Sequence, residues 1–200
     1  MKRLAYFIRG INGKHEGLDW TDEAQYIAFE QTTLAADTYK YWSRFLANLF
    51  AGGRERVIAQ DIREWQELGR VVPVMHSHGC ELGIGAMRHV TKSVDEFVMI
   101  AAAVSRDCRK NGLLDLLESG KIKHVTAYTS TGDGALKWGG NWLGRLVGFG
   151  DFGRCTQAEI NATLPPELHG RITVHQDNTM GHNDWITGDS LVHIVRLLEL

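Results

Sequence analysis

The chain has 200 residues, of which 44% are hydrophobic and 23% are charged, and this fits one folded domain over residues 1–200 with a full hydrophobic core. The formal net charge is -2 and the basic residues are scattered, which argues against nucleic acid as a partner. Cys80, Cys108 and Cys155 are far apart and odd in number, so a disulfide framework is not expected. The first apolar run is interrupted by Arg9 without a cleavage site, and no stretch approaches the roughly 20 apolar residues that a membrane span needs. We therefore expect a cytoplasmic protein with no membrane span.

Stretches typical of strands and of helices alternate along the chain. This alternation predicts an α/β fold in which a mainly parallel sheet has helices on both faces. The expected strands are 4–8, 39–42, 71–75, 96–103, 123–129 and 171–174. The expected helices include a short one starting at 22–26, and then 55–68, 80–89, 112–119 and 189–198.

The stretch 71–89 organises the rest of the sequence. A β-branched apolar run, 71–75, is typical of a strand buried on both faces, and 80–89 reads as a helix. Between them the turn 76–79 carries Ser77. A serine in such a turn lies above the carboxyl edge of the sheet, and the N-terminus of the following helix offers N–H groups to a developing oxyanion.

The run Met75-His-Ser-His-Gly79 resembles the G-x-S-x-G nucleophile elbow of the α/β-hydrolase family in its G-H-S-x-G form, with Met75 in place of the first glycine. The resemblance implies an α/β-hydrolase-like domain, without a large lid in so short a chain. It makes Ser77 the nucleophile and the backbone N–H of His78 an oxyanion donor. The second donor comes from the loop after an early strand, where Gly10 matches the family and Ile11 is our candidate. Arg9 stands where the family commonly has histidine, and an ordinary strand-ending turn is an equally good interpretation of this loop.

In this family the acid and then the histidine follow the serine, each just past a strand. The stretch 128–136 resembles the family's acid turn and assigns Asp133, and 180–184 resembles its late Gly-His motif and assigns His182 as the base. His175, Asp177 and Asp184 are the substitutes if either residue is misplaced. The resemblance implies a serine esterase or lipase-like hydrolase that cleaves a small-molecule ester or related acyl bond through an acyl-enzyme, with no cofactor and no metal.

Two alternatives remain open at this point. His76-x-His78 also fits the start of a metal-dependent hydrolase site such as H-x-H-x-D-H, with Cys80 where the aspartate would stand. The chain could also be a non-catalytic, hydrolase-like binding module, in which Met75 and Arg9 mark a site no longer kept for chemistry. Separately, an aspartate in a Gly-Asp-Gly turn is often only turn chemistry.

The segment 138–150 has an unusual composition, rich in glycine and tryptophan. Its glycines Gly140, Gly144 and Gly148 are spaced to lie on one face of a helix, and Trp142 falls on another. We expect either a helix packed tightly on the sheet or a lip over the serine that offers aromatic surface to an acyl group. Trp142 from this segment, together with Gly10 from the loop after the first expected strand, is our candidate for contact with the substrate.

Overall fold

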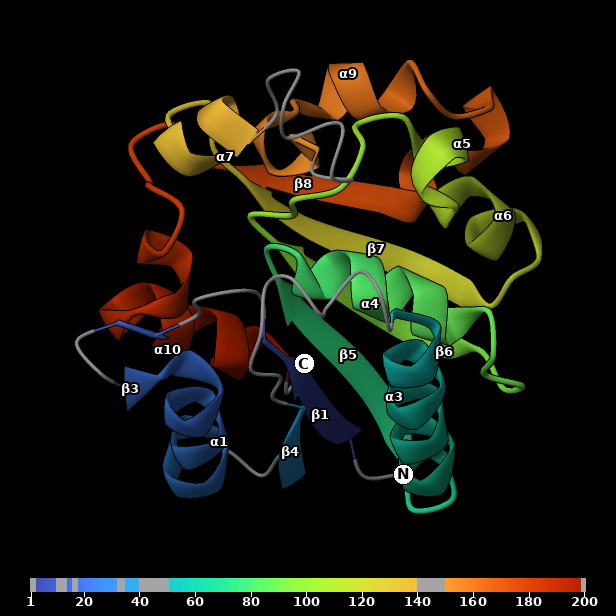
Figure 1. Cartoon of the computed structure of the whole chain (residues 1–200), viewed down its shortest axis with the longest axis vertical. Helices are drawn as coiled ribbons and strands as arrows, with labels where there is room; N and C mark the ends of the chain where they lie inside the picture. Colours follow the sequence, from blue (N-terminus) through green and yellow to red (C-terminus); the bar gives the residue numbers. More distant parts are fainter. Residues whose placement is uncertain are drawn as a thin grey trace.

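Six strands pair side by side in one parallel sheet with the order β4-β1-β5-β6-β7-β8 (Figure 1). The computed structural model describes residues 3–9, 14–15, 18–31, 35–39, 51–139 and 150–198. The sheet strands are β1 (Arg3–Ile8), β4 (Ala35–Tyr39), β5 (Arg70–His76), β6 (Val94–Ile100), β7 (Ile122–Thr129) and β8 (Ile172–Gln176). A short antiparallel pair, β2 (Lys14–His15) with β3 (Leu18–Asp19), follows β1 in the chain.

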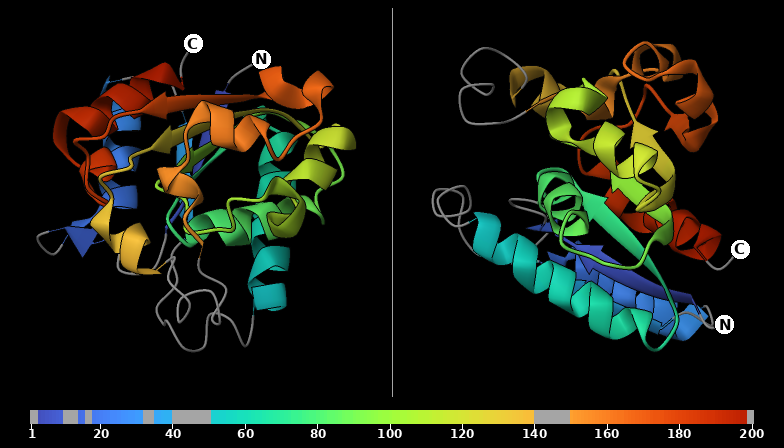
Figure 2. Two further views of the ribbon diagram at one scale, coloured as in Figure 1. Left: turned by 90° about the horizontal axis from the view of Figure 1, so that it is seen from above. Right: turned by 90° about the vertical axis from the view of Figure 1, so that its right-hand side faces the viewer.

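Helices cover both faces of this sheet (Figure 2). One face packs against α3 (Ala51–Gln66), α4 (Gly79–Met87), α5 (Cys108–Asn111), α6 (Leu113–Glu118) and α9 (Gln157–Asn161). The other face packs against α1 (Trp20–Gln31) and α10 (Gly188–Leu197). The other helical elements of the described residues are α7 (Gly134–Gly139) and the 3₁₀ turns η1 (Phe152–Arg154), η2 (Pro166–Arg171) and η3 (Asp184–Ile186).

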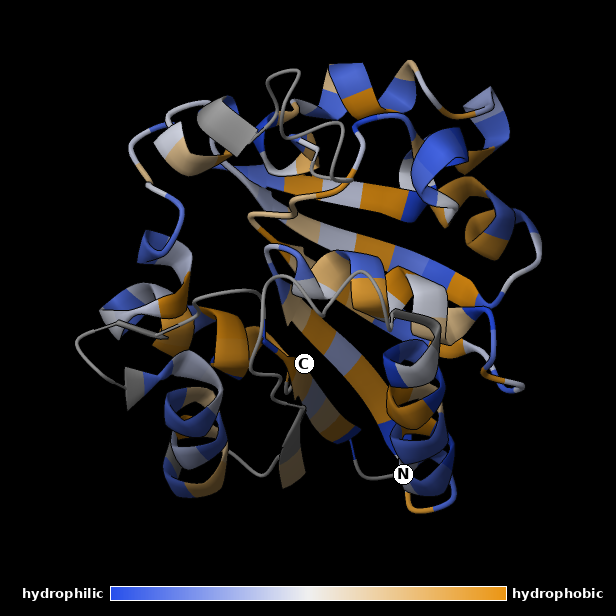
Figure 3. Cartoon of the chain, in the orientation of Figure 1, coloured by the Kyte–Doolittle hydropathy of each residue, from blue (hydrophilic) through white to orange (hydrophobic). Residues whose placement is uncertain are grey.

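The hydrophobic pattern explains these layers. Every residue of β1 after Arg3 and of β5 after Arg70 is buried, as expected for central parallel strands that are covered on both faces. In α3, Ile58 and Ile62 are one turn apart and fully buried, whereas Arg56, Arg63 and Glu64 of that helix are exposed. Figure 3 shows the same division, with apolar central strands and polar outer helix surfaces.

The covering of the second face is incomplete toward β8. There Glu96 on β6 accepts a hydrogen bond from His124 on β7, and the other ring nitrogen of His124 bonds the hydroxyl of Thr173 on β8. The side chains of Glu96 and His124 are 30% and 32% exposed. The amino-terminal half of this edge is therefore a polar, partly solvated surface of the sheet.

The free edge of β8 is closed by a side chain. Gln157 at the start of α9 donates to the carbonyl of Ile172 and accepts from the N–H of Val174, at 2.9 Å in both cases. Its amide therefore replaces a neighbouring strand. This satisfies backbone groups that would otherwise be open to pairing with another chain.

Most of the expected elements are confirmed. In the described residues the second strand of the sheet is Ala35–Tyr39, whose register on β1 pairs Leu4 with Ala35 and Ile8 with Tyr39. Residues 40–42 of the expected strand 39–42 lie outside the described residues. The expected helix at 22–26 extends over Trp20–Gln31, while α5, α7 and α9 were not predicted. Most of 138–150 lies outside the described residues. In the described part of the chain, no helix has the length and apolar character needed to cross a membrane.

Candidate active site

Ser77 lies between the end of β5 and the start of α4, in the turn His76–Gly79, called here the serine turn. Its φ is 56°, in the left-handed region that a non-glycine residue adopts at a cost of about 1–3 kcal/mol. The next strand stabilises this conformation, since Ser77 N–H donates to Ile100 O at 2.9 Å and Ala103 N–H donates to Ser77 O at 3.1 Å. Ser77 is thereby fixed at the carboxyl edge of the sheet, where the residue is 6% exposed.

Gly79 allows the serine turn to approach β1. A Cβ on Gly79 would stand 2.7 Å from Ile8 O, a distance that real Cβ atoms essentially never show, and 3.1 Å from Arg9 O, which is tighter than most real contacts. Because both obstacles are backbone atoms, only glycine fits here without moving the strand or the helix. The final glycine of the motif is therefore explained by the close approach of α4 to the end of β1.

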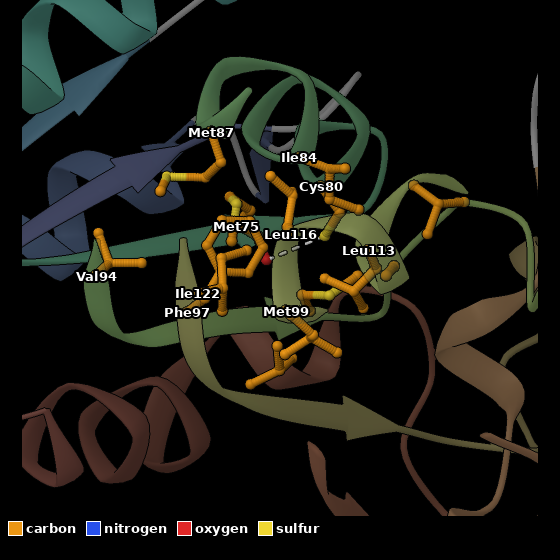
Figure 4. Close-up of a cluster of buried hydrophobic side chains, with 14 of the residues drawn as sticks. Met75, Cys80, Ile84, Met87, Val94, Phe97, Met99, Leu113, Leu116 and Ile122 are labelled. Carbon is orange, nitrogen blue, oxygen red and sulfur yellow. Dashed lines mark hydrogen bonds between the residues drawn. The ribbon is translucent and has the colours of Figure 1, made fainter. Parts of the chain in front are cut away.

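Met75, which replaces the first glycine of the motif, is accommodated by a glycine further along the chain. Its fully buried side chain fills the space beside Gly83 in α4, so that a Cβ on Gly83 would lie 2.1 Å from Met75 Sδ. Figure 4 shows Met75 among the buried side chains under α4, with the Cys80 thiol donating to Met75 O at 3.5 Å. A methionine can therefore replace the first glycine of the motif because residue 83 is also a glycine and leaves room for its side chain.

Asp133 follows β7, at the end of the turn 130–133, called here the aspartate turn. The two carboxylate oxygens of this buried residue have separate partners: Oδ1 accepts from Leu136 N–H at 2.9 Å at the start of α7, and Oδ2 accepts from His182 Nδ1 at 2.7 Å. The guanidinium of Arg154 donates to Thr131 O and supports the turn from outside. The carboxylate is therefore held in one orientation by bonds from both sides.

His182 lies in the segment 177–187 between β8 and α10, called here the histidine loop. Its Nδ1–H donates to Asp133, and its Nε2 accepts a hydrogen bond from the hydroxyl of Ser77, with Oγ at 2.9 Å. The imidazole is 18% exposed, while the aspartate is almost fully buried. Ser77, His182 and Asp133 thus form one continuous chain of hydrogen bonds, although His182 is 105 residues from Ser77 and 49 residues from Asp133 in the sequence.

Arg9, at the end of β1, forms a buried ion pair with Asp19. Thr21 at the start of α1 donates both its backbone N–H and its hydroxyl to the same carboxylate, at 3.1 and 2.8 Å. Three groups therefore satisfy Asp19, as a buried charge requires. The pair ties the end of β1 to the beginning of α1, a role that was not apparent from the sequence.

His76, at the end of β5, is almost fully buried. Its Nε2–H donates to the carbonyl of His182 at 3.0 Å, and its ring lies against that of His182 with centroids 4.9 Å apart. Burial, with a smaller contribution from the neighbouring His182, lowers the pKa of His76 from 6.5 to about 3. His76 is therefore neutral at physiological pH.

The structure places the remaining sequence-predicted residues as follows. His78 is the N-cap of α4, and its ring lies 2.9 Å from the Glu81 carboxylate. His175 stacks on Tyr128, while Asp177 and Asp184 accept bonds from within the histidine loop, so none of these substitutes joins the bonded chain in the described residues. Gly10, Ile11 and Trp142 lie outside the described residues.

The metal-site alternative gains no support from this geometry. His76 Nε2 is bonded to His182 O, and burial raises the pKa of the Cys80 thiol, which keeps it protonated. Over residues 3–9, 14–15, 18–31, 35–39, 51–139 and 150–198, no group of three or more His, Cys, Asp and Glu side chains is placed to bind a metal ion. The His76-x-His78 pair therefore has no third ligand there.

Solved structures of an esterase and of a thioesterase domain share this fold. Esterase PE8 matches with a TM-score of 0.57 and 14% identity, over 98% of this chain and 91% of its own. The NocB thioesterase domain from the Nocardicin cluster matches with a TM-score of 0.52 and 11% identity, over 98% and 91%. An uncharacterized protein from Bacillus cereus ATCC 10987 has a TM-score of 0.62 and 15% identity over 98% of this chain, which spans 57% of that protein's chain. No protein-family model and no curated protein matches. At these identities the likeness establishes the fold, an α/β-hydrolase-like parallel sheet covered by helices.

Proposed function

We propose that this protein is a serine hydrolase that cleaves an ester or a related acyl bond. The observation that carries the proposal is the bonded chain Ser77–His182–Asp133, which begins at a serine held at positive φ at the carboxyl edge of the sheet. Serine is a poor nucleophile unless a base takes its proton, and the base needs a carboxylate to fix its tautomer. These are the contacts that His182 makes on its two sides.

The proposed mechanism is a two-step acyl transfer. Ser77 Oγ attacks the acyl carbonyl as its proton passes to His182 Nε2, and Asp133 stabilises the imidazolium. The leaving alcohol or thiol takes that proton as the tetrahedral intermediate collapses to an acyl-serine. A water molecule then attacks the acyl-serine with His182 again as the base, which releases the acid and restores the serine.

The oxyanion of each tetrahedral intermediate needs donors close to Ser77. The backbone N–H of His78, at the N-terminus of the nine-residue helix α4, is the proposed first donor, where the dipole of the helix favours negative charge. Ile11 remains the proposed second donor. Gly79 supports this pair of donors, because it allows the N-terminus of α4, which carries His78, to lie against the end of β1, which precedes Ile11 in the chain.

The class of substrate follows from the chemistry of the site and from the structural neighbours. An activated serine attacks oxygen esters and thioesters, and the neighbours with similar folds include an esterase and a thioesterase domain. We therefore propose small esters and acyl thioesters as the substrates to test. Trp142 stays a proposed contact for the acyl group.

The experiment is active-site labelling with a fluorophosphonate probe, which reacts with activated serines. The wild type is compared with Ser77→Ala and with Ser93→Ala, a control that replaces an exposed serine before β6. We expect stoichiometric labelling of the wild type and of Ser93→Ala, none of Ser77→Ala, and no effect of a metal chelator. A folded wild type that resists the probe and hydrolyses neither ester nor thioester panels would refute the proposal and favour a binding module. Activity that the chelator abolishes would favour the metal alternative.

A further inference from the structure

Two side chains, one at the end of β5 and one just after β7, hold the backbone at and next to His182. His76, the last residue of β5, donates its Nε2–H to the carbonyl of His182 at 3.0 Å. Ser130, the first residue after β7, donates its hydroxyl to the carbonyl of Met180 at 2.6 Å. One donor is adjacent to Ser77 in the chain, and the other is three residues before Asp133.

These two bonds are the anchors of the central part of the histidine loop. The backbone bonds at Met180, Gly181 and Asp184 stay inside the loop. Apart from the contacts of the imidazole itself, in the part of the chain that the structure describes only His76 and Ser130 bond residues 180–183 to the sheet edge. Ser130 Oγ also accepts from Gly132 N–H at 3.1 Å, so the same hydroxyl links the aspartate turn to the histidine loop.

His76 is suited to this task because it donates without carrying charge. A carbonyl only accepts, so the bond fixes the proton of His76 on Nε2. The ring is 1% exposed and lies between Trp20, at a centroid distance of 6.0 Å, and His182 at 4.9 Å. Its lowered pKa keeps it neutral when His182 accepts a proton, so it places no like charge against the imidazolium.

We propose that His76 and Ser130 are positioning residues for the general base. They fix the backbone of His182 so that Nε2 meets Ser77 while Nδ1 meets Asp133, and they do so from the two turns that carry those partners. This inference rests on the proposed function. It gives His76 a role in catalysis, exerted through His182, rather than a role in metal binding.

The test compares variants that remove or restore the donor. His76→Phe keeps the ring and loses the N–H, His76→Gln restores an N–H donor at a similar reach, and Ser130→Ala removes the second anchor. Replacement of the exposed His193 of α10 by Phe is the matched control. The rate of fluorophosphonate labelling and the kcat and KM for a small ester are measured, with thermal unfolding as the check of folding.

We expect His76→Phe and Ser130→Ala to lower the labelling rate and kcat by roughly 10- to 100-fold, with KM changed by less than about twofold. His76→Gln should recover most of the loss, and His193→Phe should match the wild type. A low-field proton resonance from the His182 Nδ1–H bonded to Asp133 should persist in His76→Gln and weaken in His76→Phe.

The outcomes separate this inference from the proposed function. An unlabelled wild type refutes both. A labelled wild type together with equally reactive His76→Phe and Ser130→Ala variants overturns the positioning role alone. A loss in His76→Phe that His76→Gln does not recover also contradicts it, because it would indicate ring packing rather than the donor. If His76→Phe does not fold, the comparison of His76→Gln with Ser130→Ala decides: Gln active and Ala impaired supports the inference, and any other pattern overturns it.

Discussion

Replacing Gly79 by alanine should separate the packing of the serine turn from the general preference of helices for alanine. The added Cβ would stand 2.7 Å from Ile8 O, whereas ordinary contacts begin at 3.4 Å, so the end of β1 and the start of α4 must separate by about 0.7 Å. Both are buried and hydrogen-bonded, and forcing extra volume into such packing costs about 1–3 kcal/mol. The same movement displaces the serine turn relative to the end of β1, so we expect the labelling rate to fall roughly 10-fold or more.

Gly53→Ala is the matched control, because a Cβ there meets nothing within 4 Å and the residue lies in α3. It should raise the free energy of unfolding by about 0.5–1 kcal/mol and leave labelling unchanged. Urea unfolding followed by tryptophan fluorescence measures the change in stability of each variant. If the dependence of the free energy of unfolding on urea concentration is unchanged, a shift of the urea midpoint reports that change directly. The reasoning is refuted if Gly79→Ala is as stable and as reactive as the wild type.

The remaining predictions concern the core under α4, the aspartate and the buried histidine. Gly83→Ala should destabilise the wild type by about 1–3 kcal/mol, because the added Cβ meets the side chain of Met75. In a Met75→Ala background the same substitution should be neutral or stabilising, and urea unfolding measures this difference. Equal effects in the two backgrounds would show that the Met75 side chain moves away freely. Asp133→Asn should stay folded and lower kcat by about 10³–10⁴-fold, since it no longer holds the tautomer of His182, and a loss under tenfold would contradict this role. His76, with a pKa of about 3 folded against 6.5 unfolded, takes up a proton on unfolding at intermediate pH, so stability falls as pH drops below 6.5. Between pH 7 and 5 the wild type should therefore lose about 2 kcal/mol more than His76→Gln, and parallel stability curves for the two would contradict the burial of a neutral His76.

The sequence predicted the parts of the site that depend on local pattern. An apolar run, a turn with Ser77 and a helix with a glycine at its start specify a strand, a sharp turn and a helix. Asp133 and His182 were assigned through the resemblance of 128–136 and 180–184 to the acid turn and the late Gly-His motif of the α/β-hydrolase family, each just past a strand-like run. Since the carboxyl ends of parallel strands meet at one edge of a sheet, this resemblance implied that the three side chains lie together.

Tertiary structure alone decided how these parts fit. The second strand lies at Ala35–Tyr39 because pairing with β1 fixes its register, which the pattern of that segment does not reveal. Met75 is tolerated because Gly83 leaves room in the next helix, and His76 donates to a carbonyl 106 residues away. Sequence periodicity reports local conformation and burial, whereas contacts over such separations depend on strand order, and strand order is set by packing of the whole chain.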